Sequence, residues 1–387
     1  MRAKLPLALW LPLQYLKAPL AEHGPCPGRA RVERRLKKTH DMRRTTGLLI
    51  TVGLLSLGTS ACSSDTGASA PPPAAPVDWH AFDLPRRVEA AAPGPTAKEK
   101  AAGDSYVAAL SSPGMAALGA TLDTDSHFTF PGLPDARGKD GVIKGHDALL
   151  GAFDSRTFAR ARVWRTDSMI AVEWTMSGTQ ARDWMGVPAS NKSVVIKGVS
   201  LLWTKDEGSI VDVHVVFDVA AVKTQLGAGP KELAGLPAPA MAGGAPQITE
   251  QAHSTDETAN VAVAHAWLDS LEHLDDAAYL SAMTDDVTVD GPEHPTSHGK
   301  DDRKAYFKSI HKAIGELDTR VDNAFGLGQF VVVEYSINGE QVGPLSWIPM
   351  KNDRVVRLHV VDVLEMTSGK IKHVTRYENP GEIIVTG

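Results

Sequence analysis

The chain contains an internal repeat in which separate segments match at one constant offset of 161 positions. Gly-Lys-Asp at 138–140 recurs at 299–301, and 172–180 (VEWTMSGTQ) recurs as 333–341 (VEYSINGEQ). Chance gives one such match, but several matches at a single offset indicate a duplication. Each copy spans about 130 residues, which is longer than the roughly 20–50 residues of a solenoid repeat. The repeat therefore predicts two tandem globular domains.

A segment rich in glycine, proline and alanine separates the two copies. It covers 226–247 (LGAGPKELAGLPAPAMAGGAPQ) and has no apolar periodicity. Such a composition is typical of a linker. We expect a first domain at 96–228, a linker at 229–252 and a second, diverged domain at 253–387.

Within each copy, helical patterns come first and strand patterns follow. In the second copy, Trp267, Leu268 and Leu271 recur at helical spacing. The expected helices are 98–110 and 261–274, with a further helix beginning near Asp140 and near Asp301. The expected long strands are 169–177, 193–203, 210–218, 329–337, 354–365 and 370–377. This order predicts an α+β fold with helices on one side of an antiparallel sheet.

The N-terminal region has the features of a secretory signal peptide at 42–61. Met42 is followed by two arginines, a twelve-residue apolar run at 47–58 and small residues before Cys62. Twelve residues are too few to span a bilayer, which needs about 20. A cysteine directly after small residues resembles the lipobox of bacterial lipoproteins, in which this cysteine is acylated. The tract at 62–95, rich in serine, alanine and proline, is expected to be a disordered tether.

These features predict an exported protein that is anchored to the membrane by lipid at Cys62. The expected side is periplasmic or the cell surface, with the outer membrane as the destination if the host is Gram-negative. We interpret residues 1–41 as a mis-called upstream translation or an overlong basic region of the signal. An unusual targeting extension is the alternative.

Charge, cysteine content and motifs exclude several classes of function. The net charge of −6 includes the basic leader, whereas nucleic-acid binding requires a basic face. The two cysteines, Cys26 and Cys62, leave no disulfide for the mature domains. Phosphate-binding loops, dinucleotide fingerprints and zinc motifs are absent from the sequence, and the histidines of 294–298 (HPTSH) have no acidic third ligand nearby. We expect no nucleic-acid partner, no cofactor and no metal.

Residues 170–227 resemble the SnoaL-like polyketide cyclases of the nuclear transport factor 2-like superfamily. The resemblance rests on a strand with a Gly-Thr turn, a Met-Gly-Val-Pro loop at 185–188, Asp218 at the end of the last strand, and Gln-Leu-Gly at 225–227. It implies a cone-shaped domain in which a curved sheet wraps helices around an apolar pocket. It also implies ring-closing aldol chemistry or related proton transfer in some members and ligand binding alone in others. Asp218 stands where the resemblance places the acid or base.

Alternation along the strand at 210–218 puts Asp212, His214 and Asp218 on one face. A turn at 205–208 pairs Trp203 with Asp212. The same register pairs Lys197 with Asp218. These side chains are therefore expected to line one patch of an otherwise apolar wall.

A carboxylate and an imidazole on such a wall suit proton abstraction next to a carbonyl group, because desolvation raises a carboxyl pKa toward neutral pH. We expect Asp218 and His214 to be catalytic and Lys197, Trp203 and Trp174 to contact the ligand. The alternative is that Lys197 and Asp218 form an exposed ion pair and that His214 belongs to the core.

The second copy carries different side chains. At the constant offset Asn379 takes the place of Asp218, so this copy acts differently or not at all. Its own inward candidates are Asp362, His373 and Tyr377, which alternation places on one face. Glu365 and Lys372 would form a pair on the opposite face, and the three candidates are expected to contact ligand.

We therefore expect a membrane-tethered tandem protein that binds a small, mostly apolar carbonyl compound, with acid–base chemistry of the aldol cyclase or isomerase type if it is an enzyme. A non-catalytic binding or interaction module outside the cytoplasm is the alternative. Because duplication often replaces the contact of a homodimer, the two domains are expected to pair within one chain.

Overall fold

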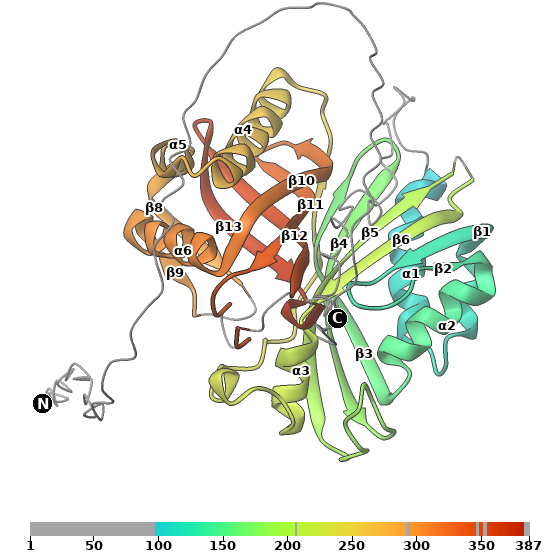
Figure 1. Cartoon of the computed structure of the whole chain (residues 1–387). Helices are drawn as coiled ribbons and strands as arrows, with labels where there is room; N and C mark the ends of the chain where they lie inside the picture. Colours follow the sequence, from blue (N-terminus) through green and yellow to red (C-terminus); the bar gives the residue numbers. More distant parts are fainter. Residues whose placement is uncertain (1–96, 206, 292–294, 346–347, 351–353, 383–387) are drawn as a thin grey trace, which may run out of the picture. The chain divides into compact units, whose positions relative to one another are not determined.

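The computed structural model describes residues 97–382, except for 206, 292–294, 346–347 and 351–353. All described residues belong to one compact unit, residues 75–387. The expected signal peptide, Cys62 and the tether lie outside the described residues, as do residues 1–41. Figure 1 shows two sheets, the first in cyan to yellow-green and the second in orange to red.

The first sheet has seven strands in the order β2-β1-β6-β5-β4-β3-β7. Its elements are α1 (Ala97–Ser111), η2 (Ala116–Ala120), β1 (Leu122–Thr129), β2 (Ala136–Arg137), α2 (Gly138–Leu150), β3 (Phe153–Arg165), β4 (Met169–Gln180), β5 (Ser193–Thr204), β6 (Ile210–Phe217) and α3 (Val219–Leu226). The expectation of an antiparallel sheet is wrong in detail, because β1 runs parallel to β6 and the sheet is mixed. The expected pairing of Trp203 with Asp212 is confirmed.

The connecting segment contributes structure of its own. It contains η3 (Lys231–Leu233) and β7 (Gln247–Glu250). Strand β7 runs parallel to β3 at the edge of the first sheet. The part expected to be only a linker therefore extends the first sheet.

The second sheet has six strands in the order β10-β11-β12-β13-β8-β9. Its elements are α4 (Thr255–Glu272), α5 (Asp276–Ser281), β8 (Met283–Asp290), β9 (Ser297–His298), α6 (Gly299–Ala313), β10 (Ile314–Leu327), β11 (Phe330–Gln341), β12 (Val355–Thr367), β13 (Lys370–Glu378) and η4 (Pro380–Glu382). Strand β8 is parallel to β13, as β1 is to β6, so this sheet is mixed as well.

The 161-residue repeat of the sequence is also a repeat of structure. Helices α2 and α6 both begin at the glycine of the Gly-Lys-Asp motif. Gly138 and Gly299 have φ angles of 73° and 77°, a conformation that a side chain with a Cβ rarely adopts. Strands β1 and β8, which precede these helices, also share the same alternation of buried and exposed residues. The motif therefore forms the turn at which each of these helices begins.

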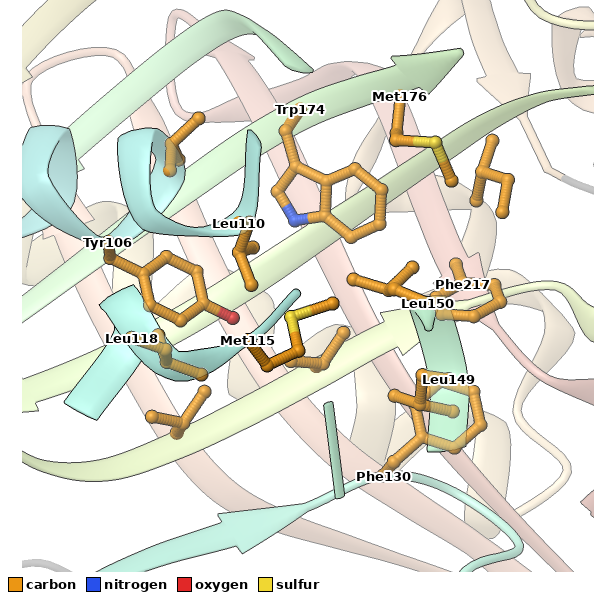
Figure 2. Packing of buried hydrophobic residues seen from close by; sticks show 14 of the residues in the cluster. Tyr106, Leu110, Met115, Leu118, Phe130, Leu149, Leu150, Trp174, Met176 and Phe217 are labelled. Atoms are coloured by element: carbon orange, nitrogen blue, oxygen red, sulfur yellow. The ribbon is translucent and has the colours of Figure 1, made fainter. Parts of the chain in front are cut away.

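Each sheet is apolar on both faces. One face packs against the helices of its own domain and forms the domain core, part of which Figure 2 shows for the first domain. The opposite faces share a third apolar cluster with members from both domains. It contains Trp164, Met169, Ala171, Val199, Leu201, Trp203 and Val216 of the first domain and Phe325, Leu327, Phe330, Val332, Val361, Val363 and Tyr377 of the second. The two domains thus contact each other through the outer faces of their sheets.

Candidate functional site

The interior of the first domain is filled by its own side chains. Tyr106, Trp174 and Phe217 are fully buried among them, as Figure 2 shows. His146 Nδ1 donates to the Val142 carbonyl at 2.9 Å, so its Nε2 accepts from the Tyr106 hydroxyl at 2.7 Å. Burial lowers the pKa of His146 to about 4, which keeps this ring neutral. Trp174, which was expected to contact ligand, belongs to this packed interior.

The face of β6 that carries His214 is turned toward the second domain. Val213 and Val215, on the opposite face of β6, belong to the core of the first domain. Val216, on the same face as His214, belongs to the cluster between the domains. Trp203 lies beside His214, with ring centroids 4.6 Å apart. The expectation that His214 and Trp203 line a pocket inside the first domain is therefore wrong, because the opposite face of the strand faces that interior.

His214 belongs to a buried polar cluster centred on Glu334 of β11. His214 Nδ1 donates to Glu334 Oε1 at 2.7 Å, and His359 Nε2 lies 2.9 Å from the same oxygen. Asn323 donates to the other oxygen at 2.6 Å. Burial alone would lower the pKa of His214, but the charge of Glu334 and hydrogen bonds to Asp212 and Glu334 outweigh it and raise the pKa to about 10. The imidazolium is thus an interdomain contact.

A second polar cluster between the domains surrounds Glu173 of β4. Glu173 accepts from Arg162 and from the hydroxyl of Tyr377, and Lys197 Nζ lies 3.4 Å from its Oε1. Arg162 also donates to Thr375 of the second domain at 3.0 Å. Tyr377 of the second domain is therefore bonded to a buried carboxylate of the first domain, which also holds Lys197 of its own sheet. The alternative of a Lys197–Asp218 ion pair is not realised, since Lys197 pairs with Glu173.

The three residues expected on one face of the second domain do not share a face. Asp362 pairs in register with Arg376, whereas Tyr377 pairs with Val361 and faces the first domain. His373 accompanies Tyr377 on that outer face, where its Nδ1 lies 2.6 Å from the Thr288 hydroxyl. Only Asp362 faces the interior. The register of β12 with β13 shifts by one residue between Glu365 and Met366. From His373 onward, each side chain of β13 therefore lies on the face opposite to the one that unbroken alternation predicts.

Asp362 fixes the guanidinium of Arg376 in the interior of the second domain. Arg376 Nε donates to Oδ1 at 3.0 Å and a terminal nitrogen donates to Oδ2 at 2.9 Å. The guanidinium also donates to the hydroxyl of Tyr306 at 2.6 Å and to that of Tyr335 at 2.8 Å. A bidentate pair of this kind sets the position of both groups.

A cavity of about 460 Å³ opens beside this network in the second domain. Its apolar wall includes Val289, Ile310 and Leu358, and its polar lining includes Arg303, Tyr306, Arg376 and Glu378. Burial raises the pKa of Glu378 to about 7; the nearby Arg376 opposes this rise, and the carboxylates of Asp362 and Asp218 add to it. One oxygen of Glu378, Oε2, is buried and has no hydrogen-bond partner.

A second cavity, of about 340 Å³, lies between the domains and shares Arg376 and Glu378 with the first. Asp218 and Lys197 both line it. Asp218 caps α3, and its Oδ1 accepts from the backbone of Ala220 at 2.7 Å and of Ala221 at 3.1 Å. Its Oδ2 is buried without a partner, and burial raises its pKa to about 6 against those two donors.

Family models match both copies. The model of the SnoaL-like polyketide cyclases matches residues 100–226, and that of the SnoaL-like domain matches residues 264–374. The chain carries two tandem SnoaL-like domains of the nuclear transport factor 2-like superfamily. No curated protein matches the chain.

Several solved structures each align with about a third of this chain. A chain from Jannaschia sp. CCS1 described as a SnoaL-like polyketide cyclase is 19% identical and covers 36% of this chain and 100% of its own length, with a TM-score of 0.32. The LEH-like epoxide hydrolase of M. tuberculosis is 16% identical and covers 33% and 86%, with a TM-score of 0.27. TsrD from Streptomyces laurentii is 16% identical and covers 32% and 91%, with a TM-score of 0.30. None of these similarities assigns an activity to the chain.

The two SnoaL-like domains thus differ in what their interiors offer. The first has a centre of fully buried side chains and a cavity of about 550 Å³ beside α3, whose lining includes Phe130, Leu133 and Met185. The second has a cavity whose lining includes Glu378, a carboxyl group with a pKa of about 7, and Tyr306, a hydroxyl held by a guanidinium. Within the described residues, no helix is long and apolar enough to cross a membrane, and no cluster of three metal-ligating side chains occurs. Sequence reasoning missed Arg376, Glu378 and Tyr306. Arg376 and Glu378 could have been found from the segment Arg-Tyr-Glu at 376–378. It places two charged residues on one face of a strand that is otherwise apolar on that face.

Proposed function

We propose that the second SnoaL-like domain binds a small, mostly apolar carbonyl compound in its cavity and moves a proton with Glu378. The observation that carries the proposal is that Glu378, a buried carboxyl group with one unpartnered oxygen, lines the same cavity as Tyr306. A cavity of about 460 Å³ with apolar walls and a few polar groups suits a ligand of one or two rings.

Glu378 has the properties of a general base. Its pKa of about 7 means that half of the molecules carry the carboxylate at neutral pH, while the conjugate acid still returns a proton readily. An ordinary glutamate, with a pKa near 4.3, is a weaker base by more than two orders of magnitude. The burial that raises the pKa is therefore what makes this carboxyl group suited to proton abstraction.

Tyr306 has the properties of a hydrogen-bond donor to a carbonyl oxygen. Its oxygen accepts from Arg376, so its own O–H proton remains for a ligand. The guanidinium of Arg303 lies 4.3 Å from its ring. Burial raises the pKa of Tyr306 to about 12, with Arg376 opposing the rise, so the hydroxyl stays protonated at neutral pH.

These groups support one sequence of steps. Glu378 removes a proton from the carbon next to the carbonyl group, and the electron pair moves to the carbonyl oxygen, where the Tyr306 hydroxyl stabilises the enolate. Return of the proton to a different carbon gives an isomer. Alternatively, the enolate carbon attacks a second carbonyl group and closes a ring, as in an aldol cyclisation, and protonated Glu378 returns its proton to the alkoxide that forms.

The first SnoaL-like domain is better suited to a non-catalytic role, and this part of the proposal rests on its packed interior. His146 and Tyr106 bond to each other deep in that interior, where both have relative exposures of 0%. The outer face of its sheet supplies Glu173 and His214 to the contact with the second domain. The first domain therefore acts as the partner that covers the second.

The signal-like segment at 42–61 and Cys62 support an exported, lipid-anchored protein. In that case both domains work outside the cytoplasm, and their ligand is a compound that reaches that side of the membrane.

The test is exchange of the α-protons of 2-tetralone in deuterium oxide, followed by NMR. The full-length protein is expected to accelerate the exchange, with a rate that rises with pH through about 7 as Glu378 ionises. Glu378→Gln should lower the rate by roughly 100-fold or more, the size of effect typical of a positioned proton-transfer group. Tyr306→Phe should also lower it, by roughly 100-fold, through loss of one oxyanion donor.

The matched control is Glu365→Gln, a carboxyl group on the neighbouring strand β12 that accepts from Gln329 at 3.2 Å near the surface. It should leave the exchange rate unchanged. A rate that is the same in the wild type, in Glu378→Gln and in the protein-free solution would overturn the catalytic proposal. Thermal unfolding of each variant separates loss of chemistry from loss of fold.

A further inference from the structure

The cavity between the two domains is lined by five separate segments of the chain. Strands β5 and β6, helix α3 and the connecting segment at 233–239 enclose it on one side, and the ends of β8 and β13 enclose it on the other. The larger apolar side chains in its lining are Val195, Ile196, Phe217, Val222, Leu233 and Leu236. An occupant must therefore present a mostly apolar body of small size.

Every side-chain donor group that lines this cavity already has at least one acceptor within the protein. Each has an acceptor: Lys197 and Tyr377 at Glu173, Arg376 at Asp362, Gln225 at the Val195 carbonyl and Thr224 at the Ala220 carbonyl. A carboxylate or phosphate on a ligand would thus compete with bonds that hold the fold together. This inventory disfavours an anionic ligand.

The free groups are acceptors. Asp218 Oδ2 from the first domain and Glu378 Oε2 from the second are both buried, and neither has a hydrogen-bond partner. The side chains are only 6% and 7% exposed. A buried acceptor without a donor has lost its hydrogen bonds to water without replacement, and this cost is larger if the oxygen is charged. A ligand that supplies donors to both oxygens would relieve that cost.

We propose that the cavity between the domains binds a small primary amine with an apolar body, its ammonium group placed between Asp218 and Glu378. An ammonium group has three donors and a positive charge, and hydrogen bonds between ionised groups are about twice as strong as neutral ones. A neutral alcohol supplies a single donor and no charge. The proposal does not depend on the proton-transfer step, because it requires only the charge and the acceptor oxygens of the two carboxylates.

The charges around the two acids make the affinity depend on pH. Besides Asp218 and Glu378, the titratable or charged groups in the lining are Lys197, Tyr377, Arg376 and Asp290. The two cations, Lys197 and Arg376, are paired with carboxylates of the protein. Asp290 accepts from the Thr296 hydroxyl at 2.5 Å, and its side chain is 42% exposed. With pKa values of about 6 and about 7, Asp218 and Glu378 are both ionised at pH 8 and largely protonated at pH 5. Amine binding should therefore strengthen between pH 5 and pH 8.

The experiment compares three probes that share one carbon skeleton: 2-phenylethylamine, 2-phenylethanol and phenylacetate. Calorimetry with the full-length protein at pH 8 should show the amine binding at least 10-fold more tightly than the alcohol and phenylacetate not binding. At pH 5 the preference for the amine should shrink.

Asp218→Asn is the informative variant, because its amide oxygen can still cap α3 while its amide nitrogen replaces the free oxygen by a donor. It should weaken amine binding by at least 10-fold and leave alcohol binding unchanged. The matched control is Asp275→Asn, which alters an aspartate that caps α5 by accepting from Ala278 at 2.9 Å and does not line this cavity. The control should bind the amine like the wild type.

Equal affinity for amine and alcohol, no detectable amine binding, or an Asp218→Asn variant that binds the amine normally would each overturn the proposal. The two proposals fail separately. Tyr306→Phe should lose proton exchange on 2-tetralone and keep amine binding. Asp218→Asn should affect amine binding more strongly than proton exchange. Amine binding without any proton exchange would leave this inference standing and remove the catalytic proposal.

Discussion

Glu334 is the residue whose replacement tests the contact between the domains most directly. Its carboxylate is fully buried and accepts from His214 of the first domain and from His359 and Asn323 of the second. Glu334→Gln keeps the shape of the side chain but removes its charge. It also places an amide N–H opposite one of the side-chain donors that now bond to the carboxylate, so that two donors face each other.

The expected cost follows from two estimates. Breaking a buried ion pair by removing one partner typically costs about 3–5 kcal/mol. A rise in the pKa of His214 from 6.5 to about 10 corresponds to about 5 kcal/mol, at about 1.4 kcal/mol for each tenfold change in proton affinity. Because Asp212 remains near the imidazolium, we expect a loss near the lower end, about 3 kcal/mol.

The loss should depend on pH in one direction. The pKa of His214 is raised in the folded state, so its stabilisation is complete below pH 6.5 and disappears as pH rises toward about 10. The pKa of Glu334 is lowered in the folded state: burial opposes this, but the charges and hydrogen bonds of His214 and His359 prevail. Its contribution is therefore present above about pH 4.5. The difference between wild type and variant should be largest near pH 6 and small near pH 10.

The assay is urea-induced unfolding followed by tryptophan fluorescence, with wild type and variant compared at pH 6, 8 and 10. Trp203 lies beside His214 and reports on this region. Glu365→Gln, at the surface of the same sheet, should change the free energy of unfolding by less than about 0.5 kcal/mol. A Glu334→Gln effect below about 1 kcal/mol at pH 6, or one that grows toward pH 10, would refute the reasoning.

Three further predictions concern packing, domain association and membrane attachment. Gly198→Ala would place a Cβ 2.6 Å from the ring of Trp174 and should lower the free energy of unfolding by about 1–3 kcal/mol in the same assay. Gly243→Ala is the control and should have almost no effect, because an added Cβ at Gly243 would have no neighbouring atom within 4 Å. Limited proteolysis should cut within 236–246, which contains no helix or strand, and the two fragments should still elute together on gel filtration because of the apolar cluster between the domains; separate elution would contradict this. Expressed from Met42 in a bacterium with lipoprotein machinery, the wild type should fractionate with membranes, and Cys62→Ser should be released or remain unprocessed; a soluble, unacylated wild type would count against the anchor.

Some features could be derived from the sequence because they depend on neighbours along the chain. The offset of 161 positions predicted two similar domains, and their strands and helices follow in the same order. The pairing of Trp203 with Asp212 followed from a short turn between β5 and β6. The long strands β3 and β10 were missed, since their half-buried middle sections lack the apolar alternation that marks a strand.

The functional residues depended on information that alternation does not contain. Alternation correctly placed Asp212 and His214 on one face of β6, but both faces of this strand are apolar, and pattern alone cannot say which one faces the interior. In the second domain, one extra residue in β13 near Lys372 reversed the parity of the strand. Arg376 and Glu378 therefore face the cavity in place of His373 and Tyr377.

The sequence by itself determined the duplication, most of the order of elements and which side chains share a face within the regular strand β6, because each of these follows from local spacing and chain geometry. Only the tertiary structure decided that the first interior is packed, that His214 and Tyr377 join the domains, and that Asp218 and Glu378 line one cavity. These outcomes depend on how two sheets, each apolar on both sides, divide their faces between a core and a partner. That choice is made by packing between residues far apart in the chain, so local periodicity carries no record of it.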